Sequence, residues 1–567
     1  MLIGIGVSEG IGIGNAVIID NSELTFNERV PISVISELER LDSAIKVFIK
    51  KTAQLAETLK ANSDLHSSEI ITGQIIMISD PHIRSRMNEV IEMGDCAEYA
   101  VTIACDTFIS LFSSAKDDLT RQRAADIRDI KQRMLQILQG IEPINISELP
   151  YGSIIVTDEL TPSMAAEINP SNIVGIIGRS GGKTSHSAIL ARALGIPAVF
   201  SQEVDFETYK ENSYVAINGA SGEIFNNPRN DVLNKLISLR DEEQQRNRAL
   251  RSFVGRKTAD REGNTKYLFA NMSKCDQIET VVENDAEGVG LFRTEYLFME
   301  RAELPSEDEQ FESYKQVALS MNDLPVLIRT IDIGGDKEVE YLGITRESNP
   351  FLGFRSIRYC LKNRNIFKTQ LKAILRAGVY GDVRIMVPMI SQVEEIIEVR
   401  RIIKEIEHEF NEKGVVYRKY MQVGAMLETP AACMIADILS HYCDFFSIGT
   451  NDLTQYVMAA DRGNVNVAYL FSTHDPAVLR MIQHAVSVAH MRSVPISMCG
   501  EAASDPLLIP IWLSFDIDAL SVSPRTVLSM RSIISKWTKE EADRVVAKVL
   551  QMNSADEVLE YLKSVEK

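Results

Sequence analysis

The sequence predicts an α/β multidomain chain whose C-terminal part is a (β/α)8 barrel. At 567 residues the chain is too long for one hydrophobic core, so several domains are expected. A stretch with helical periodicity, from about residue 31 to 140, interrupts shorter β-rich runs near the N-terminus. Beyond residue 256, eight strand-like runs alternate with helical stretches, which is the pattern of such a barrel.

The N-terminal part is predicted to be one α/β domain, formed by residues 1–20 and 144–227. The first piece is strand-like and broken by glycines. Short runs rich in β-branched residues return after residue 144, and they are Ser153–Val156, Ile173–Ile177 and Tyr214–Ile217. Residues 21–143 are therefore predicted to be an insertion in this domain.

The insertion is predicted to be a helical bundle. Proline and glycine are scarce in it, and apolar residues recur at helical spacing, as at Leu38, Leu41, Ile45, Phe48 and Ile49. About four segments are expected, with breaks near 61–64, Pro81 and Gly94. A long charged helix around residues 122–133 closes the bundle.

A charged stretch, residues 228–255, has no clear apolar face and is predicted to be a solvated linker helix. Residues 256–567 are then expected to form the barrel. Its predicted strands are Tyr267–Met272, Gly288–Arg293, Val326–Ile333, Val383–Ile390, Gln422–Glu428, Phe445–Thr450, Ile496–Gly500 and Ala519–Val522.

Composition narrows the function classes. The net charge of -19 argues against a protein that mainly grips nucleic acid and suits attraction of a basic protein partner. No apolar run approaches the roughly 20 residues of a membrane span, and the N-terminus has no signal-peptide pattern. The seven cysteines form no CxxC pair, so reduced thiols and a cytoplasmic location are expected.

His186 is the first candidate functional residue, in the run Gly181-Gly-Lys-Thr-Ser-His186. The glycines predict a turn, and Thr184 or Ser185 is placed to cap the helix that follows. His186 would then lie in the first helical turn, where exposed N–H groups favour an anion on a nucleophilic imidazole. A lone histidine at such a place is more often structural, and that reading stays open without the surrounding motif.

Charged residues follow the predicted barrel strands, where the sites of such barrels lie. Four arginines and a lysine predict a site for a small, highly charged anion, and they are Arg293, Arg329, Lys337, Arg355 and Arg462. Glu428 and Asp452 are oxygen ligands suited to Mg²⁺. Cys499 is either a small buried apolar residue or a proton donor to carbon, and the sequence leaves both open.

Over nearly its whole length the chain resembles Enzyme I of the bacterial phosphoenolpyruvate:sugar phosphotransferase system. The resemblance rests on ordered motifs, which are Gly181–His186, Gly288–Met299, Arg329–Lys337, Asn349–Gly353, Phe446–Tyr456 and Met498–Glu501. It implies that the α/β domain swivels, that phosphoenolpyruvate and Mg²⁺ bind the barrel, and that the barrel forms a homodimer. The inserted bundle would dock the carrier protein HPr. Two positions depart from the family pattern, since Lys183 replaces an arginine and Ala165 a threonine.

The resemblance also implies residue roles. His186 would take the phosphoryl group and pass it to a histidine of HPr, while Cys499 would protonate the enolate to give pyruvate. Substrate binding would fall to the four arginines, Lys337, Asn451 and Asp452, and the metal to Glu428 and Asp452.

The alternatives are a related phosphoenolpyruvate-utilising enzyme that serves a different HPr-like carrier and a catalytically inactive scaffold. A dikinase or synthase of the same superfamily would need an ATP-binding domain, and no Gly-rich nucleotide loop precedes His186.

Overall fold

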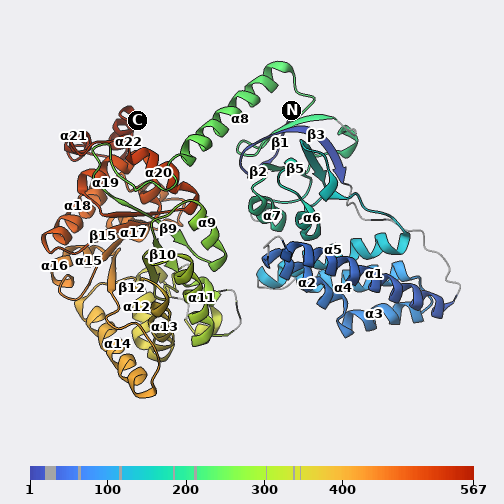
Figure 1. Ribbon diagram of the computed structural model, residues 1–567, viewed down its shortest axis with the longest axis horizontal. Helices are drawn as coiled ribbons and strands as arrows, with labels where there is room; N and C mark the ends of the chain where they lie inside the picture. Colours follow the sequence, from blue (N-terminus) through green and yellow to red (C-terminus); the bar gives the residue numbers. More distant parts are fainter. Residues whose placement is uncertain are drawn as a thin grey trace. The chain divides into compact units, whose positions relative to one another are not determined.

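The computed structural model describes residues 1–19, 24, 33–61, 65–113, 118–182, 185–209, 213–299, 301, 303–335, 339–344 and 347–567. It divides into two compact units, Met1–Arg246 and Asn247–Lys567 (Figure 1). The fold class predicted from the sequence is confirmed, because the first unit holds a sheet and a helical bundle and the second holds a closed barrel.

The first unit contains an eight-stranded sheet in the order β1-β8-β7-β3-β4-β5-β6-β2. Parallel pairs join β3, β4, β5 and β6, while the edges pair antiparallel. The strands are β1 Leu2–Ile3, β2 Ile5–Ser8, β3 Ile11–Ile19, β4 Ser153–Thr157, β5 Ile173–Gly178, β6 Ala198–Phe200, β7 Tyr214–Asn218 and β8 Glu223–Asn226.

Each face of this sheet packs a separate apolar cluster. Ile155 of β4 lies in the cluster that includes apolar residues of helices α6 (Pro162–Glu167) and α7 (His186–Leu194). Its neighbours Ile154 and Val156 lie in the other cluster. This alternation follows from the two-residue period of a strand. Helix α7 is thereby fixed against the sheet.

The described residues between β3 and β4 form five helices, where about four segments were predicted. They are α1 Val34–Ala61, α2 Leu65–Ile78, α3 Pro81–Glu92, α4 Ala97–Ser113 and α5 Asp118–Gln139. The last predicted segment is two helices, and the salt bridge of Lys131 to Asp106 (2.7 Å) joins them. Two helices can bury their apolar faces against each other in one bundle core, which a single continuous helix of that length cannot do.

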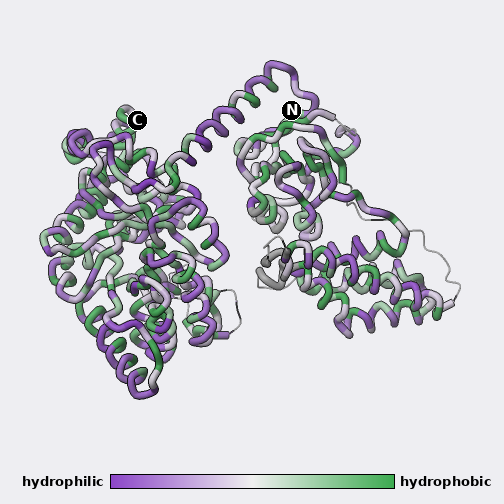
Figure 2. The backbone as a smooth tube through the Cα atoms, in the orientation of Figure 1, coloured by the Kyte–Doolittle hydropathy of each residue, from purple (hydrophilic) through white to green (hydrophobic). Residues whose placement is uncertain are grey.

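Helix α8 (Asn230–Arg251) spans the boundary between the two units. Among its residues only Leu236 is buried, and Figure 2 shows hydrophilic colour along most of its length. A helix that is polar on nearly all sides gains little from packing, so its stability depends on helix propensity and charge pairs.

The second unit is a closed barrel of eight parallel strands, ordered β9 to β16 around the ring. The strands are β9 Tyr267–Met272, β10 Val289–Arg293, β11 Val326–Arg329, β12 Val383–Val387, β13 Val423–Leu427, β14 Phe446–Gly449, β15 Ile496–Cys499 and β16 Ala519–Val522. All eight predicted strands are present. The third was predicted too long, because the chain leaves the sheet after Arg329.

Helices connect and surround these strands. They are α9 Ile278–Glu283, α10 Tyr296–Met299, α11 Glu307–Ser320, α12 Ser356–Lys362, α13 Arg364–Ala377, α14 Val393–Lys413, α15 Pro430–Met434, α16 Ala436–Leu439, α17 Thr450–Met458, α18 Pro476–Met491, α19 Ile509–Phe515, α20 Val527–Ile534, α21 Lys539–Val549 and α22 Ala555–Ser564. One large apolar cluster joins them to the outer faces of the strands. In the part of the chain that the structure describes, no helix is long and apolar enough to cross a membrane.

Arg531 of α20 ties two segments to the helices around the barrel, namely the residues that precede β9 and the loop between α9 and β10. It is 1% exposed, and its guanidinium donates to the Asp285 carboxylate (2.5 Å), the Asp285 carbonyl (2.6 Å) and the Phe253 carbonyl (2.9 Å). Its Nε donates to the Thr258 hydroxyl at 3.0 Å. One buried side chain thus satisfies four acceptors.

Replacing Arg531 by Met should lower the free energy of unfolding of the barrel by about 2–4 kcal/mol, because it removes four hydrogen bonds and, among the described residues, leaves the Asp285 carboxylate with only the Gly255 N–H as a donor. Denaturant unfolding followed by tryptophan fluorescence measures this, since both tryptophans, Trp512 and Trp537, belong to the barrel. Arg544→Met is the control, because Arg544 forms only an exposed ion pair with Glu540. Equal losses in the two variants would contradict the role given to Arg531.

Candidate functional site

A cavity of about 500 Å³ lies at the carboxyl ends of the barrel strands. Its charged lining consists of four arginines and five acids, which are Arg293, Arg329, Arg355, Arg462, Glu295, Asp332, Glu428, Asp452 and Glu501. Leu291, Tyr296, Met299, Met426, Gly449, Thr450, Asn451, Cys499 and Gly500 complete it. The guanidinium and carboxylate charges nearly balance before any ligand is bound.

Strand ends and first helical turns bring these side chains together. Arg293 and Arg329 end the neighbouring strands β10 and β11, where they are paired in register. Arg355 is the N-cap of α12, and Asp452 lies in the first turn of α17, which directly follows β14. Strand order around a closed barrel therefore decides which side chains meet.

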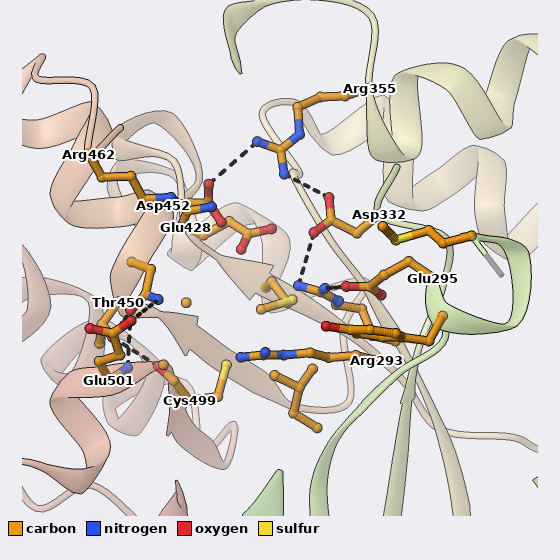
Figure 3. A pocket seen from close by; sticks show the side chains of 18 residues that line it. Arg293, Glu295, Asp332, Arg355, Glu428, Thr450, Asp452, Arg462, Cys499 and Glu501 are labelled. Atoms are coloured by element: carbon orange, nitrogen blue, oxygen red, sulfur yellow. Dashed lines mark hydrogen bonds and ion pairs between the residues drawn. The ribbon is translucent and has the colours of Figure 1, made fainter. Parts of the chain in front are cut away.

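A chain of alternating charges crosses the cavity (Figure 3). Arg329 pairs with Glu295 and, at 3.1 Å, with Asp332. Arg355 pairs with Asp332 at 2.8 Å and reaches Asp452 at 3.4 Å. We call these five residues, Glu295, Arg329, Asp332, Arg355 and Asp452, the arginine–carboxylate network.

The two arginines of the network stay charged although they are almost fully buried. Burial opposes the charged form of Arg329, but Glu295 and Asp332 offset it and raise the pKa of the guanidinium above its usual value. Burial likewise opposes the charge on Arg355, and Asp332 and Asp452 raise its pKa. Both guanidiniums therefore remain permanent cations, ready to exchange a carboxylate for a ligand oxygen.

Glu428, at the end of β13, is a carboxyl of the site whose charged form is disfavoured. Burial raises its pKa to about 8, and Asp452 and Asp332 add to the rise, while Arg329 lowers it. Its Oε1 accepts a hydrogen bond from the Met389 backbone N–H at 2.6 Å. A Cβ at Gly449 would lie 2.6 Å from Glu428 Oε2, so only glycine leaves room for this carboxylate.

These residues fit a hard divalent cation. Within the described residues no cluster of three or more His, Cys, Asp or Glu side chains forms a ready metal site. Mg²⁺ typically takes only one or two carboxylates and fills its other positions with water and substrate oxygens. Glu428 and Asp452 supply those two carboxylates, and their mutual repulsion is what a cation would relieve.

Cys499 ends β15 and is 1% exposed. Burial raises the pKa of its thiol to about 11, while a hydrogen bond from the Ser447 hydroxyl (3.6 Å) lowers it. The thiol itself donates to the Ile448 carbonyl at 3.5 Å. Cys499 is therefore a protonated thiol near neutral pH, in the state that a proton donor requires.

The first turn of α17 is tied to the end of β15 beside this thiol. Thr450 donates to the Cys499 carbonyl at 3.1 Å, and Asn451 accepts from the Glu501 N–H at 3.0 Å. Arg462 reaches the cavity from the loop after α17 and lies against the Phe351 ring at 5.8 Å. Figure 3 shows the Arg293 side chain extending towards Cys499 from the end of β10.

Eight of the residues predicted for the barrel site line this single cavity, and they are Arg293, Arg329, Arg355, Glu428, Asn451, Asp452, Arg462 and Cys499. Lys337 lies outside the described residues. Sequence reasoning gave no role to Glu295 or Asp332, although both lie in the network. Their positions at the ends of predicted strands were the signal that could have found them, since Glu295 lies two residues after one strand and Asp332 is the penultimate residue of another.

His186 lies in the first unit and begins α7, as the sequence predicted. Ser185 is the N-cap, and its hydroxyl accepts from the Ala188 N–H at 3.2 Å. The loop before it packs against Phe200, since a Cβ at Gly181 would lie 2.6 Å from that ring. The His186 side chain lies outside the described part of the chain.

Three models of the phosphoenolpyruvate-utilising enzymes match the chain. The PEP-binding domain matches residues 248–539, the mobile domain residues 149–222 and the N-terminal model residues 3–123. Among curated relatives, the phosphoenolpyruvate-protein phosphotransferase of Geobacillus stearothermophilus is 38% identical over 99% of this chain and 97% of its own. Those of Bacillus subtilis and Staphylococcus aureus are 37% and 34% identical, each over 99% of this chain and 98% of their own.

The raised pKa of Glu428 predicts a pH-dependent loss of stability. A carboxyl with a raised folded-state pKa stabilises the fold fully below its unfolded pKa, and this contribution is lost as pH rises through about 8. Glu428→Gln should therefore become more stable than the unchanged protein as pH rises from 5 to 9. Denaturant midpoints in metal-free buffer measure the difference. The exposed Glu501→Gln is the control, and a constant difference for Glu428→Gln across this range would refute the assignment.

Proposed function

Because the chain belongs to the phosphoenolpyruvate-protein phosphotransferases, we propose that it transfers the phosphoryl group of phosphoenolpyruvate to His186 and then to a histidine of HPr. The observation that carries the proposal is the cavity where four arginines, a buried acid pair and a protonated thiol meet. It offers an anion clamp, a metal site and a proton donor together. Such an arrangement suits a phosphorylated enol carboxylate.

Substrate binding would replace ion pairs that already exist. The phosphate and carboxylate of phosphoenolpyruvate would take the places of Asp332 and Asp452 on Arg329 and Arg355, with Arg293, Arg462, Lys337 and Asn451 assisting. Guanidiniums held in place before binding lose little freedom when the substrate arrives. Glu428 and Asp452 would hold a Mg²⁺ ion, which supplies charge neutralisation for the phosphate oxygens when bound.

The transfer would run in two steps, first the transfer of the phosphoryl group and then the transfer of a proton. The neutral His186 imidazole attacks phosphorus, so that an N–P bond forms while the bond from phosphorus to the enol oxygen breaks. The enolate then takes the Cys499 proton at its methylene carbon and becomes pyruvate. The thiolate left behind regains a proton from water, and the cycle is completed when the N–P bond at His186 breaks as the phosphoryl group passes to the histidine of HPr.

The second acceptor and the assembly belong to the same proposal. The helical bundle, residues 21–143, is proposed to dock HPr, and α8 is proposed to let His186 serve two partners in turn. The net charge of -19 favours encounter with a basic carrier. Homodimerisation through the barrel and a cytoplasmic location stay predictions.

Incubation with labelled phosphoenolpyruvate and Mg²⁺ should leave an acid-labile, base-stable phosphate on the protein, because a phosphohistidine contains an N–P bond. His186→Ala should carry no label. His82→Ala, at the exposed start of α3, should be labelled like the unchanged protein. Label that persists on His186→Ala would refute the assignment of the acceptor.

Cys499→Ala should bind phosphoenolpyruvate with nearly unchanged affinity but form pyruvate at least about 100-fold more slowly, because a positioned proton donor contributes that much. A coupled assay of pyruvate release measures the rate, and direct titration measures the affinity. Cys443→Ala is the control, since Cys443 is a buried thiol that does not line the cavity. Normal pyruvate formation in Cys499→Ala would remove the thiol from the mechanism.

A further inference from the structure

Gln370 is a fully buried amide on the inner face of helix α13. Its neighbours on that face are Phe367, Leu371 and Ile374, all buried and apolar. The helical period therefore puts a polar side chain where the fold would otherwise take an apolar one. Burying an amide is costly unless all its polar atoms are paired, so the partners of Gln370 are informative.

All the polar atoms of the Gln370 side chain are paired with residues of the barrel. Its Oε1 accepts from the Ile331 backbone N–H at 2.9 Å. Its Nε2 donates to the Thr294 hydroxyl at 3.0 Å and to the Tyr314 hydroxyl at 3.3 Å. The orientation of the amide is settled by these partners, because a backbone N–H can only donate.

Thr294 extends these bonds to the strand that carries Arg329. Its hydroxyl donates to the Arg329 backbone carbonyl at 2.7 Å. Thr294 itself directly follows Arg293, whose strand pairs in register with that of Arg329. Through Thr294 and directly at Ile331, the one amide therefore holds the backbone at the Arg329 carbonyl and two residues further on, and it contacts the residue that follows Arg293.

The ends of these strands need such support. Strand β11 ends at Arg329, and the bond from the Thr330 N–H to the Met386 carbonyl (2.9 Å) follows it. One residue later the Ile331 N–H bonds to Gln370 instead of to a neighbouring strand. The ion pairs of Arg329 fix only its guanidinium, so the position of its backbone depends on these bonds.

The other end of this chain of hydrogen bonds, from Tyr314 through Gln310, makes no hydrogen bond to either arginine strand, although the Tyr314 ring packs against Phe292 of β10. The Tyr314 hydroxyl donates to Gln310 Oε1 at 3.2 Å, and Gln310 Nε2 donates to the Pro305 carbonyl at 3.1 Å. Gln310 is 1% exposed and Gln370 fully buried, so the two amides are matched in chemistry and burial. They differ in what they hold, which makes Gln310 a control for Gln370.

We propose that Gln370 is a positioning residue for substrate binding, which acts through Thr294 and Ile331 to hold Arg293 and Arg329 at the spacing that phosphoenolpyruvate requires. The inference rests on the proposed function for the identity of the ligand. Gln370 does not line the cavity and takes no part in the bond changes. Gln370 affects how Arg293 and Arg329 bind the substrate before any bond changes, and therefore it affects the affinity.

The test measures the dissociation constant of phosphoenolpyruvate with Mg²⁺ and the thermal midpoint for four variants of the full chain. Gln370→Met and Thr294→Val should weaken binding roughly tenfold, since small misplacements of positioning groups have effects of this order. Gln310→Met should lower the thermal midpoint as Gln370→Met does, yet bind within about twofold of the unchanged protein. Thr294→Ser keeps the hydroxyl and should bind normally.

Gln370→Met and Thr294→Val should also show coupling, because they break one shared chain of bonds. The double variant should bind about as weakly as either single variant, whereas independent effects would multiply. If Gln370→Met does not fold, the comparison of Thr294→Val with Thr294→Ser decides the question.

Two results would overturn the inference. Unchanged affinity in Gln370→Met and Thr294→Val would show that these bonds serve only stability. An equal loss of affinity in Gln310→Met would show that any buried amide in this layer has the same effect. Failure of the unchanged protein to bind phosphoenolpyruvate would instead contradict the proposed function, and the inference would fall with it.

Discussion

The barrel site depends on the balance of charge in the arginine–carboxylate network. Arg329 and Arg355 are buried, and each is accompanied by carboxylates that keep it ionised. Without those partners two buried cations would destabilise the fold, and with no cations the carboxylates would do the same. The cavity is therefore stable as built, yet its pairs are of the kind that an incoming phosphate or carboxylate can replace. Exchange of partners, rather than creation of new charge, lets a strongly anionic ligand enter a protein with a net charge of -19.

The same balance of charge explains why the two carboxyls proposed to hold the cation, Glu428 and Asp452, lie beside the arginines. When a ligand takes guanidinium groups away from Asp332 and Asp452, those carboxylates lose their partners next to Glu428, whose pKa burial and these neighbours already raise. A divalent cation between Glu428 and Asp452 would compensate for that loss, so anion and cation binding should favour each other. The closed barrel makes this possible because strands that are far apart in the chain deliver their side chains to one ring of strand ends.

Much of this organisation could be predicted from the sequence because it follows local patterns. The two-residue and 3.6-residue periods gave the eight barrel strands and the helical insertion, and motifs after strand ends gave eight of the cavity residues. The number of bundle helices was wrong, because periodicity does not reveal where a long helical segment breaks. The pairing of Asp332 with both arginines and the role of Gln370 depend on which strands and helices are neighbours in space. A buried glutamine at an apolar helix position looks like a defect in the pattern until its partners are known.

In the proposed reaction, the two units would stabilise the same phosphoryl group in different ways. The barrel offers guanidiniums that are held in place by carboxylates, which a ligand would replace. The α/β domain offers fixed backbone, because Ser185 caps α7 and His186 is its first residue, where unpaired N–H groups favour an anion. Helices α6 and α7 share an apolar cluster, and the Ser187 hydroxyl donates to the Leu160 carbonyl (3.0 Å), so this helix start is held rigidly. Ala165 in α6 has no hydroxyl to offer, so in the proposed reaction the backbone N–H groups at this helix start would help to stabilise a phosphoryl group on His186.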